Sequence, residues 1–360
     1  MYLEWLQIGH VRILDQVRIE PGPRLNIFAG PNACGKTAFL ESIHLLARAR
    51  SFRTPRIQEV VRKGEETLQI SARAGYRGSD QRVITGIEKG RGQVAIRYAG
   101  TPVRTVSEQA RNLPLVLATP DSHILVTGTP KQRRHWLDWA MFHVEPTYLE
   151  HWRDYVRALR HRNSLLKEGV RDSGLFQIWE KTMARAGEAM AQARKGFIQE
   201  LGLQLNEVAA SRFPYEISVD ITRGWPADTG LEECLARSRA GDRAAGFTRY
   251  GPHRADILFG CNGESLAARF SRGQIKLFVC LLMLAEGAVV EKLSDEPPVF
   301  LLDDYAAELD ARASEYLLNR VMERGWQAFV TTTEFREPDR FPGQKRVFHV
   351  EHGEIAKVVE

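Results

Sequence analysis

An eight-residue segment near the start of the chain constrains the fold more than any other feature. Gly30-Pro31-Asn32-Ala33-Cys34-Gly35-Lys36-Thr37 fits G-x-x-x-x-G-K-[ST] at every fixed position. The glycines let the backbone turn so that its amide groups, and the N-terminus of the next helix, face an anion. We expect Lys36 to reach the outer phosphates and Thr37 to hold Mg²⁺. The segment therefore predicts a loop that binds a nucleoside triphosphate.

The residues on either side of this segment fit a strand, a loop and a helix. The apolar run Leu25-Asn26-Ile27-Phe28-Ala29 precedes the loop. The apolar residues that follow it recur at helical spacing: Phe39, Leu40, Ile43 and Leu46. A chance match to the motif is the alternative, and this strand-loop-helix context argues against it.

Two adjacent carboxylates follow a second apolar run far downstream. Val299-Phe300-Leu301-Leu302 predicts a central parallel strand, and Asp303 and Asp304 follow it at the carboxyl edge of the sheet, where open α/β folds bind ligands. We expect Asp303 to enter the Mg²⁺ shell and Asp304 to orient or deprotonate the attacking water. A strand that ends in a polar turn is the alternative, but two carboxylates downstream of a P-loop favour the functional interpretation.

A third segment, Ser271-Arg272-Gly273-Gln274, precedes an apolar helical pattern. The Ser271 hydroxyl and the first amide groups of that helix predict a second anion site. Taken alone, S-x-G-Q is typical of an ordinary capped helix. The order P-loop, S-x-G-Q, then an apolar strand with two aspartates favours a functional site in two halves.

Composition and charge set wider limits. The 360 residues are compatible with about two domains, and 43% hydrophobic residues suffice for a core. The net charge of +5 permits a nucleic-acid partner without requiring one. The four scattered cysteines lack metal-ligand spacing, which favours ordinary thiols in a reducing compartment. No uninterrupted apolar run approaches about 18 residues, so we expect a cytoplasmic protein without a membrane partner.

Further segments carry a resemblance to a known family. In chain order they are Arg48–Thr54, Pro130–Asp138, Arg162–Leu166, Gly251–Asp256 and Ala307–Asp310. Together with the three motifs above, they make nearly the whole chain similar to the RecF family of bacterial recombination-repair proteins, within the SMC-like ABC-type ATPases.

The resemblance implies an α/β fold: an ABC-type ATPase head with a mixed sheet and a P-loop, in a two-lobed SMC-head-like architecture with an inserted helical arm lobe. It also implies that ATP is held between two protomers. The P-loop of one protomer then faces Ser271, Gly273 and Gln274 of the other, and Asp310 lines the interface. In that scheme ATP joins the homodimer and hydrolysis releases it.

The chain departs from the family pattern at three places. The acidic pair expected after Gly-Pro-His-Arg is here Ala255-Asp256, which leaves Asp256 to make the contact alone. Thr332 stands where transporter-type relatives place a switch histidine, and we predict that it senses the γ-phosphate. Asp304 stands where many relatives use glutamate, so hydrolysis is expected to be slow.

The interval between Lys36 and Ser271 predicts the arm. Apolar and aromatic residues recur at helical steps over 137–166 and 197–208, with a turn predicted at Ser173-Gly174 and a helix start or kink at Pro146. The simplest fold is an antiparallel helical pair. Its aromatic stripe is more typical of a helix-helix core than of a base-stacking face.

Candidate DNA contacts are arginines from two basic runs. They are Arg50, Arg53 and Arg56 in the head, and Arg153, Arg157 and Arg160 on one face of an arm helix. Acids beside both runs leave a merely solvated face as the alternative. Any DNA contacts are expected to be with phosphates, independent of sequence and sensitive to salt.

We predict a discontinuous head, residues 1–121 and 245–360, and an inserted, mainly helical arm lobe, residues 122–244. Tyr215–Val219 has the pattern of a strand and is compatible with either part, and Asn262-Gly263 predicts a hairpin turn.

The resemblance predicts an ATP-dependent DNA-binding protein of recombinational repair. It implies a nucleotide-switched dimeric clamp at junctions of single- and double-stranded DNA, with slow, DNA-stimulated ATP hydrolysis. It also implies RecR and RecO as partners in loading RecA. Two alternatives stay open: a transporter motor, which the insertion disfavours, and a soluble ABC factor acting on the ribosome, although such factors usually carry two P-loops in one chain.

Overall fold

The computed structural model describes residues 1–90, 92, 94–213, 215–304, 311–333 and 345–359. The chain divides into two compact units, which we call the head unit (Met1–Ser122 with Arg272–Glu360) and the arm unit (His123–Ser271). The predicted boundary at 244/245 lies too early. The arm unit continues from this boundary to Ser271, because strand β10 (Asp256–Cys261) pairs there with β9 (Ile217–Thr222).

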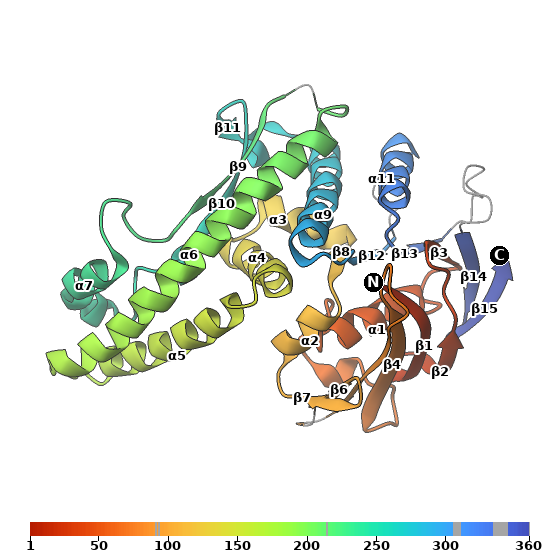
Figure 1. Cartoon of the computed structure of the whole chain (residues 1–360), viewed down its shortest axis with the longest axis horizontal. Coiled ribbons are helices and arrows are strands. Elements are labelled where there is room, and N and C mark those ends of the chain that lie inside the picture. Colours follow the sequence, from red (N-terminus) through yellow and green to blue (C-terminus); the bar gives the residue numbers. More distant parts are fainter. Residues whose placement is uncertain (91, 93, 214, 305–310, 334–344, 360) are drawn as a thin grey trace. The chain divides into compact units, whose positions relative to one another are not determined.

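The first of two six-stranded sheets in the head unit is antiparallel, in the order β2-β1-β4-β5-β6-β7 (Figure 1). Its strands are β1 (Tyr2–Val11), β2 (Leu14–Ile19), β4 (Thr67–Gly75), β5 (Arg82–Gly90), β6 (Val94–Tyr98) and β7 (Thr101–Val103).

The second sheet has the order β15-β14-β3-β13-β12-β8. All of its strands are parallel except β15, which is antiparallel to β14. They are β3 (Leu25–Ala29), β8 (Leu115–Ala118), β12 (Val299–Leu302), β13 (Ala328–Thr332), β14 (Lys345–Glu351) and β15 (Glu354–Val359). The strands predicted before the P-loop and before the acidic pair are therefore confirmed as β3 and β12, and β12 has a parallel neighbour on each side.

Helix α1 (Lys36–Arg48) packs against both sheets. Its residues from Ala38 to Ala47 are all buried. Phe39 stacks on Phe28 of β3 with ring centroids 4.1 Å apart, and the same core includes Ile8 of β1. The helix that begins at the P-loop is thus fixed by packing on two sides, and this fixes the loop that precedes it.

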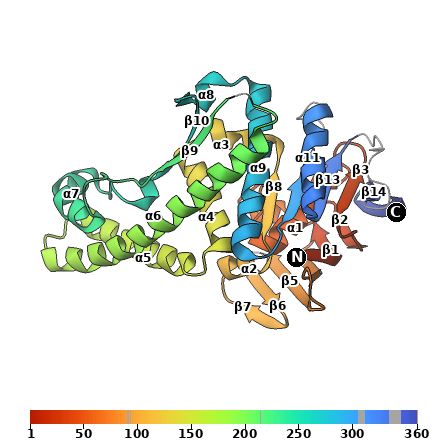
Figure 2. The same cartoon turned by 45° about the horizontal axis from the view of Figure 1, so that its top comes forward.

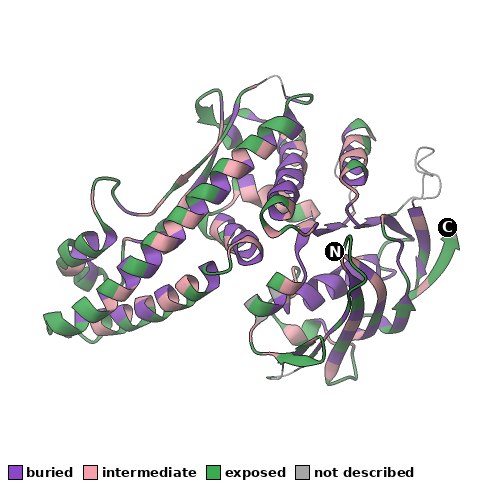
Figure 3. Ribbon diagram, in the orientation of Figure 1, coloured by how far each residue is buried: buried purple, intermediate pink, exposed green. Residues whose placement is uncertain are grey.

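Helix α9 (Arg272–Ser294) is the one helix in the described chain that is long and apolar enough, by length and composition, to cross a membrane. In the structure 72% of its apolar window is buried, and most of this helix is coloured as buried in Figure 3. It lies beside β8 and α11 (Ala311–Arg324) (Figure 2), and α2 (Val106–Asn112) packs on α1. A core helix of a globular unit has these properties, so they are weak evidence for a membrane span.

The arm unit is built on a helical hairpin of α5 (Tyr148–Lys167) and α6 (Ser173–Ala209) (Figure 1). Its first long helix, α4 (Pro130–Val144), ends before Pro146, and α5 begins two residues after it, close to the helix start predicted at Pro146. The turn of the hairpin precedes the predicted Ser173-Gly174, because Asp172 caps α6 and accepts a 2.7 Å hydrogen bond from the Gly174 amide. Tyr148 and Tyr155 are buried, which confirms that the aromatic stripe is core.

The arm unit also contains a small antiparallel sheet, in the order β11-β10-β9. Asn262 and Gly263 have positive φ angles of 49° and 81° and form the predicted tight turn between β10 and β11. The remaining elements are α3 (Ile124–Thr127), α7 (Leu231–Ala245), β11 (Glu264–Ser265) and α8 (Leu266–Arg269). Asp256 accepts two hydrogen bonds from Arg133, at 2.7 and 3.0 Å, so the sole acid of its motif forms an ion pair within this unit.

We expect replacement of Arg162 with methionine to destabilise the arm unit by about 3 kcal/mol. The Arg162 side chain is fully buried and donates to Glu180 (3.1 Å) and Asp242 (2.8 Å), so its loss leaves two buried carboxylates short of a partner. Urea unfolding followed by circular dichroism measures the change. Arg157→Met is the matched control, because Arg157 is 64% exposed and its ion pair with Asp154 should contribute little. Equal stability of the two variants would contradict this account of the network.

Candidate nucleotide-binding site

The P-loop follows β3 and has a backbone that few residues other than glycine tolerate. Gly35 has a φ of 118°, in the region that favours glycine, and Ala33 has a φ of 63°. A Cβ at Gly30 would lie 2.1 Å from the carbonyl oxygen of Val350 in β14. The two fixed glycines of the motif are therefore required by the turn and by the close approach of β14.

Lys36 is buried at the start of α1 and lies across the loop. Its Nζ donates to the carbonyl oxygens of Gly30 (2.7 Å) and Pro31 (2.8 Å). The N-cap residue of α1 is Gly35, which has no side chain to cap the helix. Within the described structure the first amide groups of α1 therefore receive no side-chain cap. A buried ammonium beside these amides has the donors and the charge that bind phosphate.

Asp303, at the end of β12, joins the P-loop helix to β13. Its Oδ1 accepts hydrogen bonds from the hydroxyl groups of Thr37 (3.0 Å) and Thr331 (2.8 Å). Burial raises the pKa of Asp303 above its ordinary value. A carboxylate and a hydroxyl oxygen at this separation form a donor set that suits Mg²⁺, which prefers hard oxygen ligands.

Asp304 has a backbone that aims its side chain differently from that of Asp303. Its φ is 48°, and its amide donates to the Thr331 hydroxyl at 2.8 Å. Its Oδ1 is buried and has no hydrogen-bond partner in the described part of the chain. Because an unpaired buried acceptor is costly, this oxygen suits a site where a water or another donor completes it.

A cavity of about 1160 Å³ brings these groups together within the head unit. The predicted residues that line it are Asn32, Ala33, Gly35, Lys36, Thr37 and Asp304. Gly30, Pro31, Cys34 and Asp303 are not among its lining residues; Gly30 and Pro31 hold Lys36, and the Cys34 carbonyl accepts from the Gly353 amide at 2.9 Å. The volume is sufficient for a nucleoside triphosphate.

The cavity also contains residues that the motifs did not indicate. Arg12, in the turn between β1 and β2, lines it and forms an ion pair with Glu41 of α1, which is fully buried. The hydrogen bond with Glu41 raises the pKa of Arg12 further, so this cation stays charged. Arg53, which we predicted as a DNA contact, lines the same cavity and lies 3.8 Å from the Glu41 carboxylate.

The residue predicted to sense the γ-phosphate, Thr332, is the neighbour of a threonine that lines the cavity. Thr332 is buried and is not among the residues that line the cavity, whereas Thr331 lines it and contacts both aspartates. Neighbouring side chains of a strand point to opposite faces, so only one of these two threonines can face the phosphates. Thr331 is therefore the threonine of this pair that lines the cavity, and the role of γ-phosphate sensor stays a prediction.

The S-x-G-Q segment does not line the cavity in the described structure. Ser271 and Gly273 are exposed and Gln274 is half-buried at the start of α9. Asp310 lies outside the described residues. The other DNA candidates are exposed: Arg50 and Arg56 in the head unit, and Arg153, Arg157 and Arg160 along α5. Their predicted role stays a prediction.

The P-loop, the acidic strand end and the helix that opens at S-x-G-Q define the class of SMC-like ABC-type ATPase heads. The family model described as RecF/RecN/SMC N terminal domain matches residues 2–356. A DNA replication and repair protein RecF from Thioalkalivibrio sulfidiphilus is 37% identical over 99% of both chains. The chain therefore belongs to the RecF family of DNA replication and repair proteins.

Solved structures agree with this assignment. The chain is similar to a structure of the recombination mediator protein RecF with ATP, of the RecFOR pathway, with a TM-score of 0.89 and 25% identity over 99% of this chain and 98% of that one. An SMC head bound to the C-terminal winged-helix domain of ScpA has a TM-score of 0.54 at 14% identity, over 99% and 97% of the two chains, and shows the fold alone. The prediction of an α/β ATPase head is confirmed. Membership of the RecF family argues against the two alternative functions, a transporter motor and a ribosomal factor.

Proposed function

We propose that the chain binds ATP in the head-unit cavity and hydrolyses it slowly. Lys36 and the first amides of α1 bind the phosphates, and Thr37 and Asp303 hold Mg²⁺, which neutralises charge on the transferred phosphoryl group. Asp304 positions the attacking water. The observation that carries this proposal is the convergence of Lys36, Thr37 and the unpaired Asp304 oxygen on one cavity.

We further propose that the site is completed by a second copy of the chain. Ser271, Gly273 and Gln274 lie outside the cavity lining, and Ser271 and Gly273 are exposed, so they are accessible to a partner protomer. Asp310 is assigned to the same interface by resemblance to the family. ATP then links two protomers, and hydrolysis separates them.

The proposed target is gapped DNA, at junctions between single and double strands. Exposed arginines of α5 supply sequence-independent phosphate contacts, and RecF relatives are named as DNA replication and repair proteins. We propose RecR and RecO as the protein partners, with RecA loading as the outcome, because the similar solved structure is described as a mediator of the RecFOR pathway.

Molar mass in solution tests the proposal directly. Light scattering without nucleotide, with ATP, and with ATP plus a gapped duplex should give a monomer, a dimer, and a dimer on DNA that dissociates as salt is raised. A monomer under all three conditions would mean that the S-x-G-Q segment does not act on a second copy.

Ser271→Ala should separate nucleotide binding from association. We expect the monomer to bind ATP as the wild type does, and the ATP-dependent dimer to weaken by about tenfold or more, because one hydroxyl contact is lost at each of the two nucleotide sites of the dimer. Ser265→Ala, which also removes an exposed serine hydroxyl, is the control. Loss of ATP from the Ser271→Ala monomer would instead place Ser271 in its own protomer's site.

A further inference from the structure

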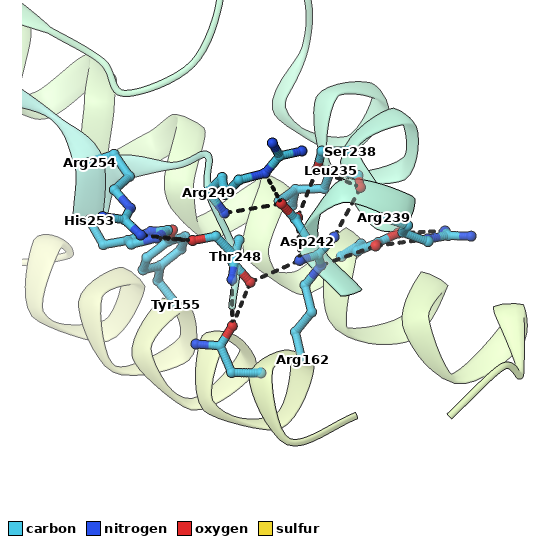
Figure 4. A network of polar contacts seen from close by, with 12 residues as sticks. Tyr155, Arg162, Leu235, Ser238, Arg239, Asp242, Thr248, Arg249, His253 and Arg254 are labelled. Atoms are coloured by element: carbon cyan, nitrogen blue, oxygen red, sulfur yellow. Dashed lines mark hydrogen bonds and ion pairs between the residues drawn. The ribbon is translucent and has the colours of Figure 1, made fainter. Parts of the chain in front are cut away.

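The loop between α7 and β10 contains the Gly251-Pro252-His253-Arg254 motif, which the ATPase site does not use. Its inner side is fixed to α5 and α7 (Figure 4). Thr248 donates from its amide and hydroxyl to Asn163 Oδ1, at 2.8 and 2.7 Å, and its hydroxyl accepts from Arg162 at 2.8 Å. This buried threonine therefore anchors the loop to the fully buried arginine of α5.

A second set of contacts fixes the rest of the loop. Arg249 donates to Asp242 Oδ1 at 2.9 Å, while Asp242 Oδ2 accepts from Arg162 on the other side (Figure 4). His253 contacts the Thr248 carbonyl oxygen at 3.0 Å and the Tyr155 hydroxyl at 2.6 Å. Burial lowers the pKa of His253 to about 4, so it is neutral at pH 7. The loop backbone is held from Thr248 to His253 without depending on an external ligand.

The outer side of the loop presents aromatic rings beside guanidinium groups. Phe247 is 43% exposed, and the Arg254 guanidinium lies 5.0 Å from its ring centroid. The Arg249 guanidinium lies 5.9 Å from the ring of Tyr250, and its side chain is 43% exposed. The exposed part of Phe247 and the guanidinium groups beside these rings are accessible to a ligand on a loop that its inner contacts hold in place.

The charge around this loop is also in excess. Three guanidiniums, of Arg162, Arg239 and Arg249, pair with the two carboxylates of Glu180 and Asp242, and that of Arg254 donates to the Thr248 carbonyl oxygen at 3.5 Å. The carboxylates lie on the inner side, fully buried, whereas Arg249 and Arg254 are exposed. The uncompensated positive charge therefore faces solvent on the side where Phe247 is exposed.

We infer that Phe247, Arg249 and Arg254 form a contact site for unpaired nucleotides of DNA. The ring of Phe247 stacks on a base, and the two guanidiniums bind the adjacent phosphates. Stacking on an aromatic ring beside cations is the usual recognition of single-stranded nucleic acid, and it is independent of sequence because every base has a π-face. A duplex offers phosphates but no free base face, so this contact favours a gap over continuous duplex.

The inference rests on the proposed binding of gapped DNA and specifies where the unpaired strand is held. Since α7 and the loop belong to the arm unit, the contact is separate from the ATP cavity, which is lined by head-unit residues. Variants of the loop should therefore alter the choice between DNA structures and leave ATP binding and the ATP-dependent dimer unchanged.

Fluorescence anisotropy with ATP tests this on a gapped duplex, a continuous duplex and oligo-dT. Phe247→Ala should weaken binding of oligo-dT and of the gap about tenfold, with the continuous duplex unaffected, because one stacked base is lost. Phe247→Trp should restore binding. Arg254→Gln should lower the salt dependence on oligo-dT by about 0.7 in the log-log slope, the loss of one phosphate contact. Leu258→Ala, an exposed apolar residue of β10, is the matched control.

The outcomes separate the two levels of the proposal. If the wild type prefers the gap and Phe247→Ala prefers it equally, the loop site is wrong and the proposed function stands. If the wild type binds neither oligo-dT nor the gapped duplex, both are wrong. If DNA binding is unchanged in all variants while poly-glutamate binds the wild type and not Arg254→Gln, the surface binds an acidic protein and the inference is overturned.

Discussion

Replacing Lys36 with alanine is expected to abolish ATP binding at micromolar nucleotide, and the ATP-dependent dimer with it. The substitution removes a buried ammonium that reaches the cavity from the start of α1. A charge-assisted hydrogen bond contributes about 1.5–3 kcal/mol, and the substitution also removes the charge of the ammonium, whose other N–H groups donate to Gly30 and Pro31, so the dissociation constant should rise about 100-fold. Isothermal calorimetry and light scattering measure the two effects.

Two controls separate this loss from a damaged loop. Lys63→Ala removes another cation from the lining of the same cavity, and we expect a much smaller change because Lys63 lies outside the P-loop. Thermal unfolding of Lys36→Ala without nucleotide reports whether the loop still folds when the contacts to Gly30 and Pro31 are gone. A folded Lys36→Ala protein that still dimerises with ATP would refute the assignment of the phosphate site.

The parts of the site that the sequence predicted are those encoded by a contiguous motif. The P-loop is such a case, because its glycines, lysine and threonine act on one loop and one helix start. Asp303 and Asp304 are another, since a buried apolar run predicts a central strand and its polar end must emerge at the sheet edge. In both cases the chemistry follows from residues that are close together in the sequence.

The parts that the sequence did not predict depend on contacts between distant segments. Arg12 comes from the turn between β1 and β2 and is held by Glu41, which the sequence shows only as a polar residue of the P-loop helix. Arg53 was assigned to DNA because charge alone does not show which way a side chain points. Thr331 and Thr332 are adjacent and chemically alike, and only the alternation of side chains along β13 decides which one lines the cavity.

The boundary of the arm unit was missed for a related reason. The pattern of Asp256–Cys261 predicts a strand, but not its partner. Pairing with β9 draws the segment into the arm unit, and the ion pair of Asp256 with Arg133 holds it there. This places the Gly251–Arg254 loop beside α5. The hydrogen bond from Arg162 to Thr248 that forms there joins residues 86 positions apart, and no sequence pattern predicts it.

Asp304→Asn should slow ATP hydrolysis by about 10²- to 10⁴-fold while ATP binding persists, which is the range that a positioned general base contributes. Asparagine preserves the shape of the side chain and the hydrogen bond from the backbone amide of residue 304 to the Thr331 hydroxyl. It removes the negative charge that accepts a proton from water. The ATP-bound dimer should then become long-lived. Single-turnover hydrolysis and the dissociation rate of the dimer after dilution measure the two effects.

Asp303→Asn is the matched control, because it alters the neighbouring carboxylate. Asp303 accepts from Thr37 and Thr331 and is assigned to Mg²⁺, so its variant should need more Mg²⁺ for nucleotide binding, whereas Asp304→Asn should not. If Asp304→Asn hydrolyses ATP at the wild-type rate, the unpaired Oδ1 does not act on water and the base must be another group. If both variants lose ATP to the same extent, the two aspartates form one metal site, and the division of roles between them is wrong.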